Sequence, residues 1–301
     1  MKKIISLLLV VLLLAGCNEK EKDVVGDALS IMCPSGAPAL AFYGELDNLD
    51  VADASAIKTQ LLTDNGPDIA VLPVNVAVSL LNGNINYKMS SIITFGNFYL
   101  VDTSKDDDGV LSSDDNIVLF SQGSIPDLLF HFIYGDLYDK NISYLNSAAD
   151  ALREIVNPNS NAEYVMIAEP LLTVALDKNP NIKVHNSLRD LYYVRTNKDL
   201  YQACILVKNG VDVNDFLGKI ENDINMLIDD PELLNKTIEA NELDKEEAMA
   251  IFGNVDADIK SIKNNNAVGI GYVNAYDNKE AIDEYLKLFG IEKTNEEIYY
   301  K

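Results

Sequence analysis

The sequence predicts an α/β protein of two lobes, with two α/β sheets joined by a hinge and a helical C-terminal tail. Strand and helix signals alternate from residue 28 to residue 101 with short connections, an order that favours a sheet with helices on both faces. An acidic, turn-rich stretch at 104–116 interrupts the pattern, and the same alternation restarts behind it. From residue 213 onward the pattern is mostly helical.

The N-terminus has the order of a secretory signal. Lys2 and Lys3 form a short basic region, an apolar run follows at 7–14, and small residues lead to Cys17. The run is too short to span a bilayer, which takes about 20 apolar residues. Leu-Ala-Gly-Cys at 14–17 resembles the lipobox of bacterial lipoproteins; an ordinary cleaved signal with an incidental cysteine is the alternative. We therefore expect a signal peptide at 1–16, lipid on Cys17 and a polar tether at 17–27.

The first run of elements is expected over 28–101. The predicted strands and helices alternate as strands 28–33, 49–54, 68–72 and 90–101 and helices 38–46, 55–63 and 76–81. Pro38 suits the first turn of its helix, because a proline at that position loses no hydrogen bond. The apolar run from Asp68 to Leu72 is typical of a buried parallel strand. Gly96-Asn97 interrupts the last strand.

The acidic stretch at 104–116 is interpreted as a solvated loop, because the alternating carboxylates and closing Glu of a calcium loop are missing. Behind it, the predicted elements are strands 116–120, 142–145, 164–168, 183–185 and 201–208 and helices 127–134, 147–156 and 170–176. A short apolar piece follows at 268–273, and Gly290 ends a helix at 279–289. The lobes are therefore expected at 28–100, with 208–275 returning to the first lobe, and at 101–207, with the tail at 276–301.

The charge of the chain excludes some partners. The formal net charge is −23 over 301 residues, and it becomes more negative when a signal peptide carrying Lys2 and Lys3 is removed. So acidic a chain argues against nucleic-acid binding, which needs clustered Lys and Arg. It also disfavours broad contact with anionic lipid head groups, so the acyl anchor is expected to supply the membrane affinity.

Cysteine and histidine usage predicts neither a metal site nor catalysis. Besides Cys17 the chain has Cys33 and Cys204, each in an apolar strand-like run, and buried free thiols are favoured over a disulfide between them. His131 and His185 are isolated and are interpreted as structural. A nucleophile elbow, a phosphate-binding loop and a full dinucleotide-binding fingerprint are missing, so we expect no cofactor and no enzyme activity.

Three predicted strand-to-helix junctions combine small residues with short polar side chains: Ser35-Gly36-Ala37, Val74-Asn75 and Gln122-Gly123-Ser124. In open α/β sheets ligands bind at such junctions, because backbone N–H groups there are unpaired and the helix dipole points outward. Glycine allows close backbone approach, while Ser, Asn and Gln supply donors and acceptors. The same residues are also ordinary turn and N-cap choices, so each segment by itself equally fits a local role.

Four segments together carry a resemblance to a known family: Ile31–Pro38 (IMCPSGAP), Gly66–Asn75 (GPDIAVLPVN), Thr94–Val101 (TFGNFYLV) and Tyr164–Leu172 (YVMIAEPLL). In this order, behind a lipobox, the chain from about 28 to 289 resembles the extracytoplasmic solute-binding proteins of ABC importers with the type II periplasmic-binding fold. The likeness is greatest to the nitrate, sulfonate, taurine and thiamine-precursor group. The resemblance implies lobes that close over a small molecule, a lipid-tethered monomer, and ABC permease subunits as partners.

The resemblance also implies that the three junctions line the cleft and that the chain crosses between the lobes at Phe95 and Asn97; Phe98 is interpreted as core. Glu169 follows an apolar strand and is expected near the cleft mouth, accepting a hydrogen bond from an amino group or a cation on the ligand. A surface charge at the start of the next helix is the alternative for Glu169. The predicted ligand-binding residues are Ser35, Gly36, Ala37, Asn75, Phe95, Asn97, Gln122, Gly123, Ser124 and Glu169.

The predicted ligand-binding residues lie in five short segments, 35–37, 75, 95–97, 122–124 and 169, and none of these contains Lys or Arg. A strongly anionic ligand would therefore depend on helix N-termini alone. We therefore expect a neutral or amino-bearing small organic molecule, such as a vitamin-like heteroaromatic compound. A small anion such as a sulfonate or nitrate is the alternative of the same class. Outside that class stand an enzyme of the same fold and a lipoprotein that acts as a sensor or surface antigen.

Overall fold

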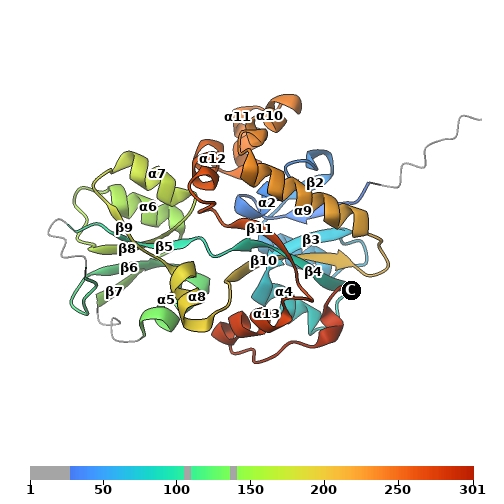
Figure 1. Cartoon of the computed structure of the whole chain (residues 1–301), viewed down its shortest axis with the longest axis horizontal. Helices are drawn as coiled ribbons and strands as arrows, with labels where there is room; N and C mark the ends of the chain where they lie inside the picture. The colour runs from blue at the N-terminus through green and yellow to red at the C-terminus, as the bar shows by residue number, and fades with distance from the viewer. Residues whose placement is uncertain (1–27, 105–109, 136–140) are drawn as a thin grey trace, which may run out of the picture.

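The computed structural model describes residues 28–104, 110–135 and 141–301 (Figure 1). The predicted signal peptide, Cys17, the tether and residues 105–109 of the acidic stretch lie outside the described residues. None of the helices in the described ranges is both long and apolar enough to cross a membrane.

The described chain forms two sheets, as predicted, and both are mixed. The first sheet has the order β11-β4-β10-β3-β1-β2, built from β1 (Ile31–Cys33), β2 (Leu49–Val51), β3 (Ile69–Pro73), β4 (Tyr87–Phe95), β10 (Tyr201–Lys208) and β11 (Ile270–Asn274). Its strand β1 is parallel to β2 and β3, whereas β10 is antiparallel to β3 and β4. Cys33 and Cys204 lie in this sheet as fully buried free thiols, which confirms the favoured prediction.

The second sheet has the order β7-β6-β8-β5-β9, built from β5 (Phe98–Asp102), β6 (Ile117–Phe120), β7 (Ile142–Leu145), β8 (Tyr164–Ala168) and β9 (Lys183–Ser187). Its strand β6 is parallel to both neighbours, and β5 is antiparallel to both of its own. The sheet is covered by α5 (Ile125–Tyr134), α6 (Ala148–Val156), α7 (Leu171–Lys178) and α8 (Leu188–Thr196). We call this sheet and these helices the second lobe (Figure 1).

The remaining helices belong to the first lobe, which we define as the first sheet and the elements that pack on it (Figure 1). They are α2 (Ala37–Leu40), α3 (Ala54–Leu61), α4 (Val74–Leu81), α9 (Asn214–Asp229), α10 (Leu233–Ala240), α11 (Lys245–Phe252), α12 (Val255–Lys263) and α13 (Lys279–Leu286), with short 3-10 turns at η1 (Leu46–Asn48), η3 (Lys287–Phe289) and η4 (Glu296–Ile298). Local chemistry starts several of them. The Asp53 carboxylate accepts from two backbone N–H groups at the start of α3, and Asp244 with Glu247 forms a capping box on α11.

The boundaries between the lobes differ from those predicted. Residues 98–100, expected in the first lobe, belong to β5 of the second sheet, and residues 201–207, expected in the second lobe, form β10 inside the first sheet. The reason is that β10 is apolar on both faces and fits between β3 and β4. The local sequence pattern does not reveal these two pairing partners. The predicted tail also joins the first lobe, since α13 packs on α4 and β10 and Tyr299 bridges to Met89.

Candidate ligand-binding site

The sheet topology groups the predicted junctions into two pairs. Because β1 and β3 are parallel neighbours, the Ser35-Gly36-Ala37 turn and Asn75 lie at the same edge of the first sheet. Because β6 and β8 are parallel neighbours, Gln122-Gly123-Ser124 and Glu169 lie at the same edge of the second sheet. The three predicted junctions and Glu169 therefore lie two to a lobe, each pair at one edge of its sheet.

In the first lobe, Gly36 has a backbone φ of 82°, a conformation that favours glycine, and its N–H donates to the carbonyl of Ile251 at 3.0 Å. This bond attaches the turn after β1 to the end of α11, while Ser35 is exposed and Ala37 begins α2. Asn75 lies in the first turn of α4. Its Oδ1 is buried and has no hydrogen-bond partner among the described residues, which leaves an acceptor available to a ligand.

In the second lobe, the polar groups of the 122–124 turn are used locally. Gly123 has a φ of 77°, and its N–H donates to the Asp127 carboxylate at 2.7 Å. The Ser124 hydroxyl donates to the Ser121 carbonyl at 2.5 Å, and Gln122 is exposed. These contacts lie within the second lobe, and they are those of a helix-starting turn.

Asn97 and Glu169 meet where the chain first crosses between the lobes. The Asn97 Nδ2 donates to the Glu169 carbonyl at 3.0 Å, and the Glu169 N–H donates to the Asn97 carbonyl at the same distance. The Asn97 Oδ1 in turn accepts from Nε2 of Gln202 at 3.3 Å, near the start of β10. Asn97 therefore ties the crossing to strands of both sheets, and its side-chain amide is engaged by the protein.

Phe95 is buried at the end of β4 rather than open to a cleft. Its ring meets Tyr201 edge to face at 5.6 Å between centroids, and the Arg189 guanidinium lies 4.9 Å from the ring centroid. Arg189 was not predicted, and both of its carboxylate contacts, at 2.7 and 2.6 Å, go to Asp199. Phe98 is buried and packs near Phe120, which confirms the core interpretation.

Glu169 is buried, with 3% of its surface exposed, and not at an open cleft mouth as expected. The reason is that Thr173 engages it within its own lobe, through a backbone N–H at 2.9 Å and a hydroxyl at 3.0 Å, while α12 of the first lobe packs on α7, the helix that follows it. Burial raises the pKa of the Glu169 carboxyl, and the hydrogen bonds from Thr173 act against that rise.

Asp258 is the residue that the sequence reasoning missed. It is fully buried on α12, and neither carboxylate oxygen has a hydrogen-bond partner among the described residues. Burial, and next the charge of Glu169, raise the pKa of Asp258 to about 8. The signal was available, since Val255, Ile259 and Ile262 form an apolar stripe at helical spacing and Asp258 lies within it.

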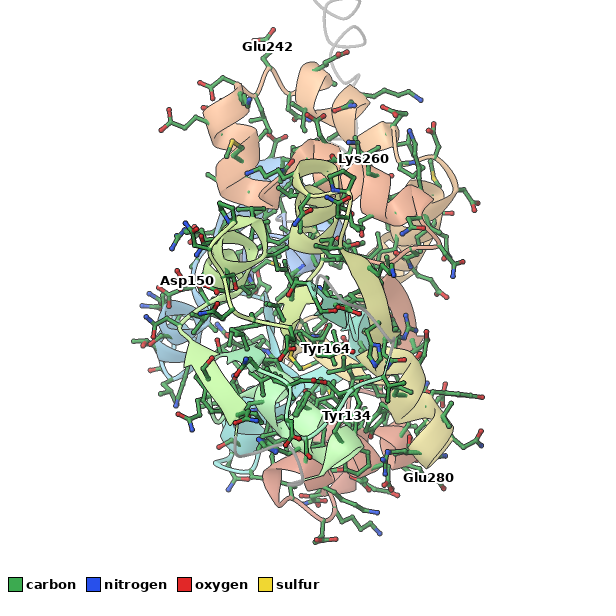
Figure 2. The ribbon with its side chains drawn as sticks, turned by 90° about the vertical axis from the view of Figure 1, so that its left-hand side faces the viewer. Tyr134, Asp150, Tyr164, Glu242, Lys260 and Glu280 are labelled. Carbon is green, nitrogen blue, oxygen red and sulfur yellow. The ribbon has the colours of Figure 1, made fainter. Side chains whose placement is uncertain are left out.

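A pocket of about 380 Å³ lies at the seam between the lobes, with Glu169 in its wall. Its wall includes Gly96, Tyr99, Glu169, Arg189 and residues 264–267. The Tyr99 hydroxyl, from β5, donates to the Ala267 carbonyl at 3.1 Å and so joins the second lobe to the first. Lys260 of α12 pairs with Asp177 of α7 at 2.5 Å across the same seam, and Figure 2 shows where Lys260 lies.

Comparison with known proteins agrees with this architecture. Residues 1–18 match the family model of the prokaryotic membrane lipoprotein lipid attachment site, which includes Cys17. No curated protein matches the sequence. An ABC transporter structure from Parabacteroides distasonis is 21% identical, with a TM-score of 0.67 over 87% of this chain and 91% of that chain.

Two further solved structures share the fold at lower identity. The periplasmic aliphatic sulphonate binding protein of Escherichia coli is 10% identical, with a TM-score of 0.60 over 91% of this chain and 92% of that one. The ligand binding component of an ABC-type import system from Staphylococcus aureus, solved with zinc bound, is 11% identical, with a TM-score of 0.57 over 91% and 96%. The predicted two-lobed α/β fold is thus confirmed as that of periplasmic-binding-type proteins.

Proposed function

We propose that the protein is the extracytoplasmic solute-binding component of an ABC importer, anchored by lipid on Cys17, and that it captures a small organic molecule between its lobes. The fold and the lipid attachment sequence both support this proposal. The observation that carries it is the pair of buried polar groups without a protein partner among the described residues, Asn75 Oδ1 at a sheet edge and the Asp258 carboxyl on α12. Buried polar groups without a partner need an explanation, and a ligand that completes their hydrogen bonds supplies one.

Capture would proceed by closure of the lobes about the two crossings of the chain. At the crossings, the Gly96 N–H donates to the Leu200 carbonyl at 3.0 Å, so both connections move as one hinge. The Tyr99–Ala267 hydrogen bond and the Lys260–Asp177 ion pair join the lobes and would open with them. Closure excludes water from the ligand's hydrogen bonds and creates the surface that permease subunits recognise. The protein would act as a monomer.

The solute is expected to be small, neutral or amino-bearing, with a vitamin-like compound as one type. A small anion such as a sulfonate or nitrate is the second candidate, because a solved structure of the same fold is named for sulphonate binding. Arg189, the cation nearest the seam pocket, already pairs with Asp199 through both acceptor oxygens, which favours the first candidate. Enzyme activity on the same fold remains the alternative of another class.

Thermal unfolding of the mature chain, begun just after Cys17, tests this proposal against vitamins, their precursors, sulfonates and oxyanions. A solute at a hundred times its dissociation constant should add about 2.7 kcal/mol of stability. A clear shift with the solute recovered unchanged supports capture, and conversion of the solute supports an enzyme instead. The proposal fails if the whole panel leaves the unfolding temperature unchanged.

A further inference from the structure

The chain crosses between the lobes twice (Figure 1). The first crossing, 96–97, joins β4, which ends at Phe95, to β5. The second crossing, 197–200, joins α8 to β10, which begins at Tyr201. When two lobes rotate about a hinge, the atoms near the axis move least. Contacts beside the crossings can therefore last through opening and closing, whereas contacts far from the crossings break.

Arg189 contacts residues at both crossings from the start of α8. Its Nε donates to Oδ1 of Asp199 at 2.7 Å and its Nη2 donates to Oδ2 at 2.6 Å, so the guanidinium binds the second crossing through two parallel bonds. The same guanidinium lies 4.9 Å from the centroid of the Phe95 ring, next to the first crossing. A side chain of the second lobe therefore holds the second crossing and a residue of the first lobe together. We refer to Arg189, Asp199 and Phe95 as the hinge clasp.

Further hydrogen bonds extend the hinge clasp to the backbone of the first crossing. Oδ1 of Asp199 also accepts from the Leu200 N–H at 2.8 Å, and the Leu200 carbonyl accepts from the Gly96 N–H at 3.0 Å. A Cβ on Gly96 would collide with the Leu200 side chain and would lie 3.0 Å from Cβ of Arg189, so these residues are closely packed. An unbroken series of contacts therefore joins α8 to the first crossing.

The geometry of the Arg189–Asp199 pair is that of a lasting contact. The two side chains are 32% and 31% exposed, so solvent screens their attraction only in part. Both acceptor oxygens are used, which fixes the plane of the guanidinium as well as its distance, and a lysine ammonium cannot reproduce that fork. The Lys260–Asp177 pair at the seam is, by contrast, more than half exposed on both sides and has one printed bond.

We propose that Arg189 is a positioning residue for solute capture, which through Asp199 and Phe95 holds the two crossings in one arrangement while the lobes open and close. This inference rests on the proposed function, because closure is the step that Arg189 serves. The hinge clasp confines the lobes to one axis of rotation, so the two halves of the site meet in register at each closure. Without the clasp the lobes also twist and slide, and a smaller fraction of molecules has the site assembled.

Distances between two spin labels test the proposal without a solute. Labels on Ala56→Cys and Ala149→Cys report on the two lobes, because Ala56 is exposed on α3 and Ala149 is exposed on α6. Pulsed electron paramagnetic resonance of the purified lipoprotein in detergent gives the distribution of distances between the labels. Cys33 and Cys204 are fully buried, and the proposed lipid occupies the sulfur of Cys17, so the native thiols stay unlabelled.

The variants are Arg189→Met, Arg189→Lys and Asp199→Asn, with Asp190→Asn as the matched control, because Asp190 is an exposed acid next to Arg189 in the chain. Arg189→Met and Asp199→Asn should each raise the ratio of distances outside to inside the wild-type range about 3- to 30-fold, as expected for the loss of a partly exposed charged hydrogen bond. The double variant should not exceed Arg189→Met, because the two residues act as one pair. Arg189→Lys keeps the charge without the fork and should fall between Arg189→Met and the wild type, and the control should match the wild type.

A wild-type distribution in Arg189→Met contradicts the proposal, and so does a change in Arg189→Met that Asp199→Asn does not reproduce. A distribution that Asp190→Asn broadens as much as Asp199→Asn also overturns it, because the effect is then one of local charge. If circular dichroism shows that Arg189→Met does not fold, Asp199→Asn and Arg189→Lys decide the question. Each of these failures leaves solute capture standing, whereas the proposed function fails separately, when no solute of the panel shifts the unfolding temperature.

Discussion

Replacing Asp258 by Asn should make the empty protein more stable at neutral and alkaline pH. Burial and the Glu169 charge raise the pKa of Asp258 from an ordinary 3.8 to about 8. Between those two values the unfolded chain releases a proton that the folded protein retains, so rising pH favours unfolding. The stability that the protonated carboxyl allows is fully present below pH 3.8 and is lost as the pH rises towards 8.

The size of the effect follows from the shift. Each pH unit inside the window costs the wild type about 1.4 kcal/mol relative to Asp258→Asn, which has no proton to lose. From pH 5 to pH 7 the difference should grow by about 2.7 kcal/mol, or roughly 5 °C in unfolding temperature for a chain of this size. Water reaching the carboxylate when the lobes open would reduce this value, which is therefore an upper figure.

Unfolding followed by circular dichroism at pH 5, 6, 7 and 8 measures the difference for the wild type, Asp258→Asn and Asp256→Asn. The Asp256→Asn control removes a carboxyl group from an exposed site of a chain with net charge −23. Its free energy of unfolding should therefore change with pH in the same way as that of the wild type. If the free energy of unfolding of Asp258→Asn changes with pH as that of the wild type does, the carboxyl titrates as an ordinary exposed acid and the prediction is wrong.

Three further changes test the anchor, the hinge and the seam. Cys17→Ser should move the protein from the membrane fraction to the soluble fraction on immunoblots, and persistent membrane association would contradict lipidation at that residue. Gly96→Ala should cost about 1–3 kcal/mol in urea denaturation, because a Cβ there collides with the Leu200 side chain, whereas Gly218→Ala, with open space around it on α9, should gain up to about 1 kcal/mol. Tyr99→Phe removes a hydrogen bond between the lobes and should weaken solute binding about 2- to 10-fold in calorimetry; unchanged affinity would remove that bond from the closure mechanism.

Local patterns were enough to predict the elements but not their partners. The apolar run at 68–72 became β3 (Ile69–Pro73), and the interruption at Gly96-Asn97 is the crossing between the sheets. The sheet to which 201–208 belongs could not be predicted, because strand pairing depends on contacts with residues more than a hundred positions away. The helix expected at 38–46 ends instead at Leu40, where the chain continues in tight turns.

The residues of the candidate site also differ in how far local sequence patterns predict them. The junctions at 35–37 and Asn75 were predictable because strand-to-helix turns have local signals. The burial of Glu169 was not, since the helix that covers it lies about ninety residues later in the chain. Asp258 was visible as an acid on an apolar helix stripe, yet only the packed structure shows that no donor of the described residues meets it.

Sharing a fold with a sulphonate-binding protein does not carry the preference for an anion over to this chain. At 10% identity the likeness concerns the backbone, whereas charge preference depends on the few side chains at the seam. Here those side chains include the buried carboxyl group of Glu169, and the neighbouring guanidinium of Arg189 is already paired with Asp199. An anion entering the same pocket would lie beside that carboxyl group and would find the guanidinium already engaged. This lining is the reason why the proposed solute is neutral or amino-bearing rather than anionic.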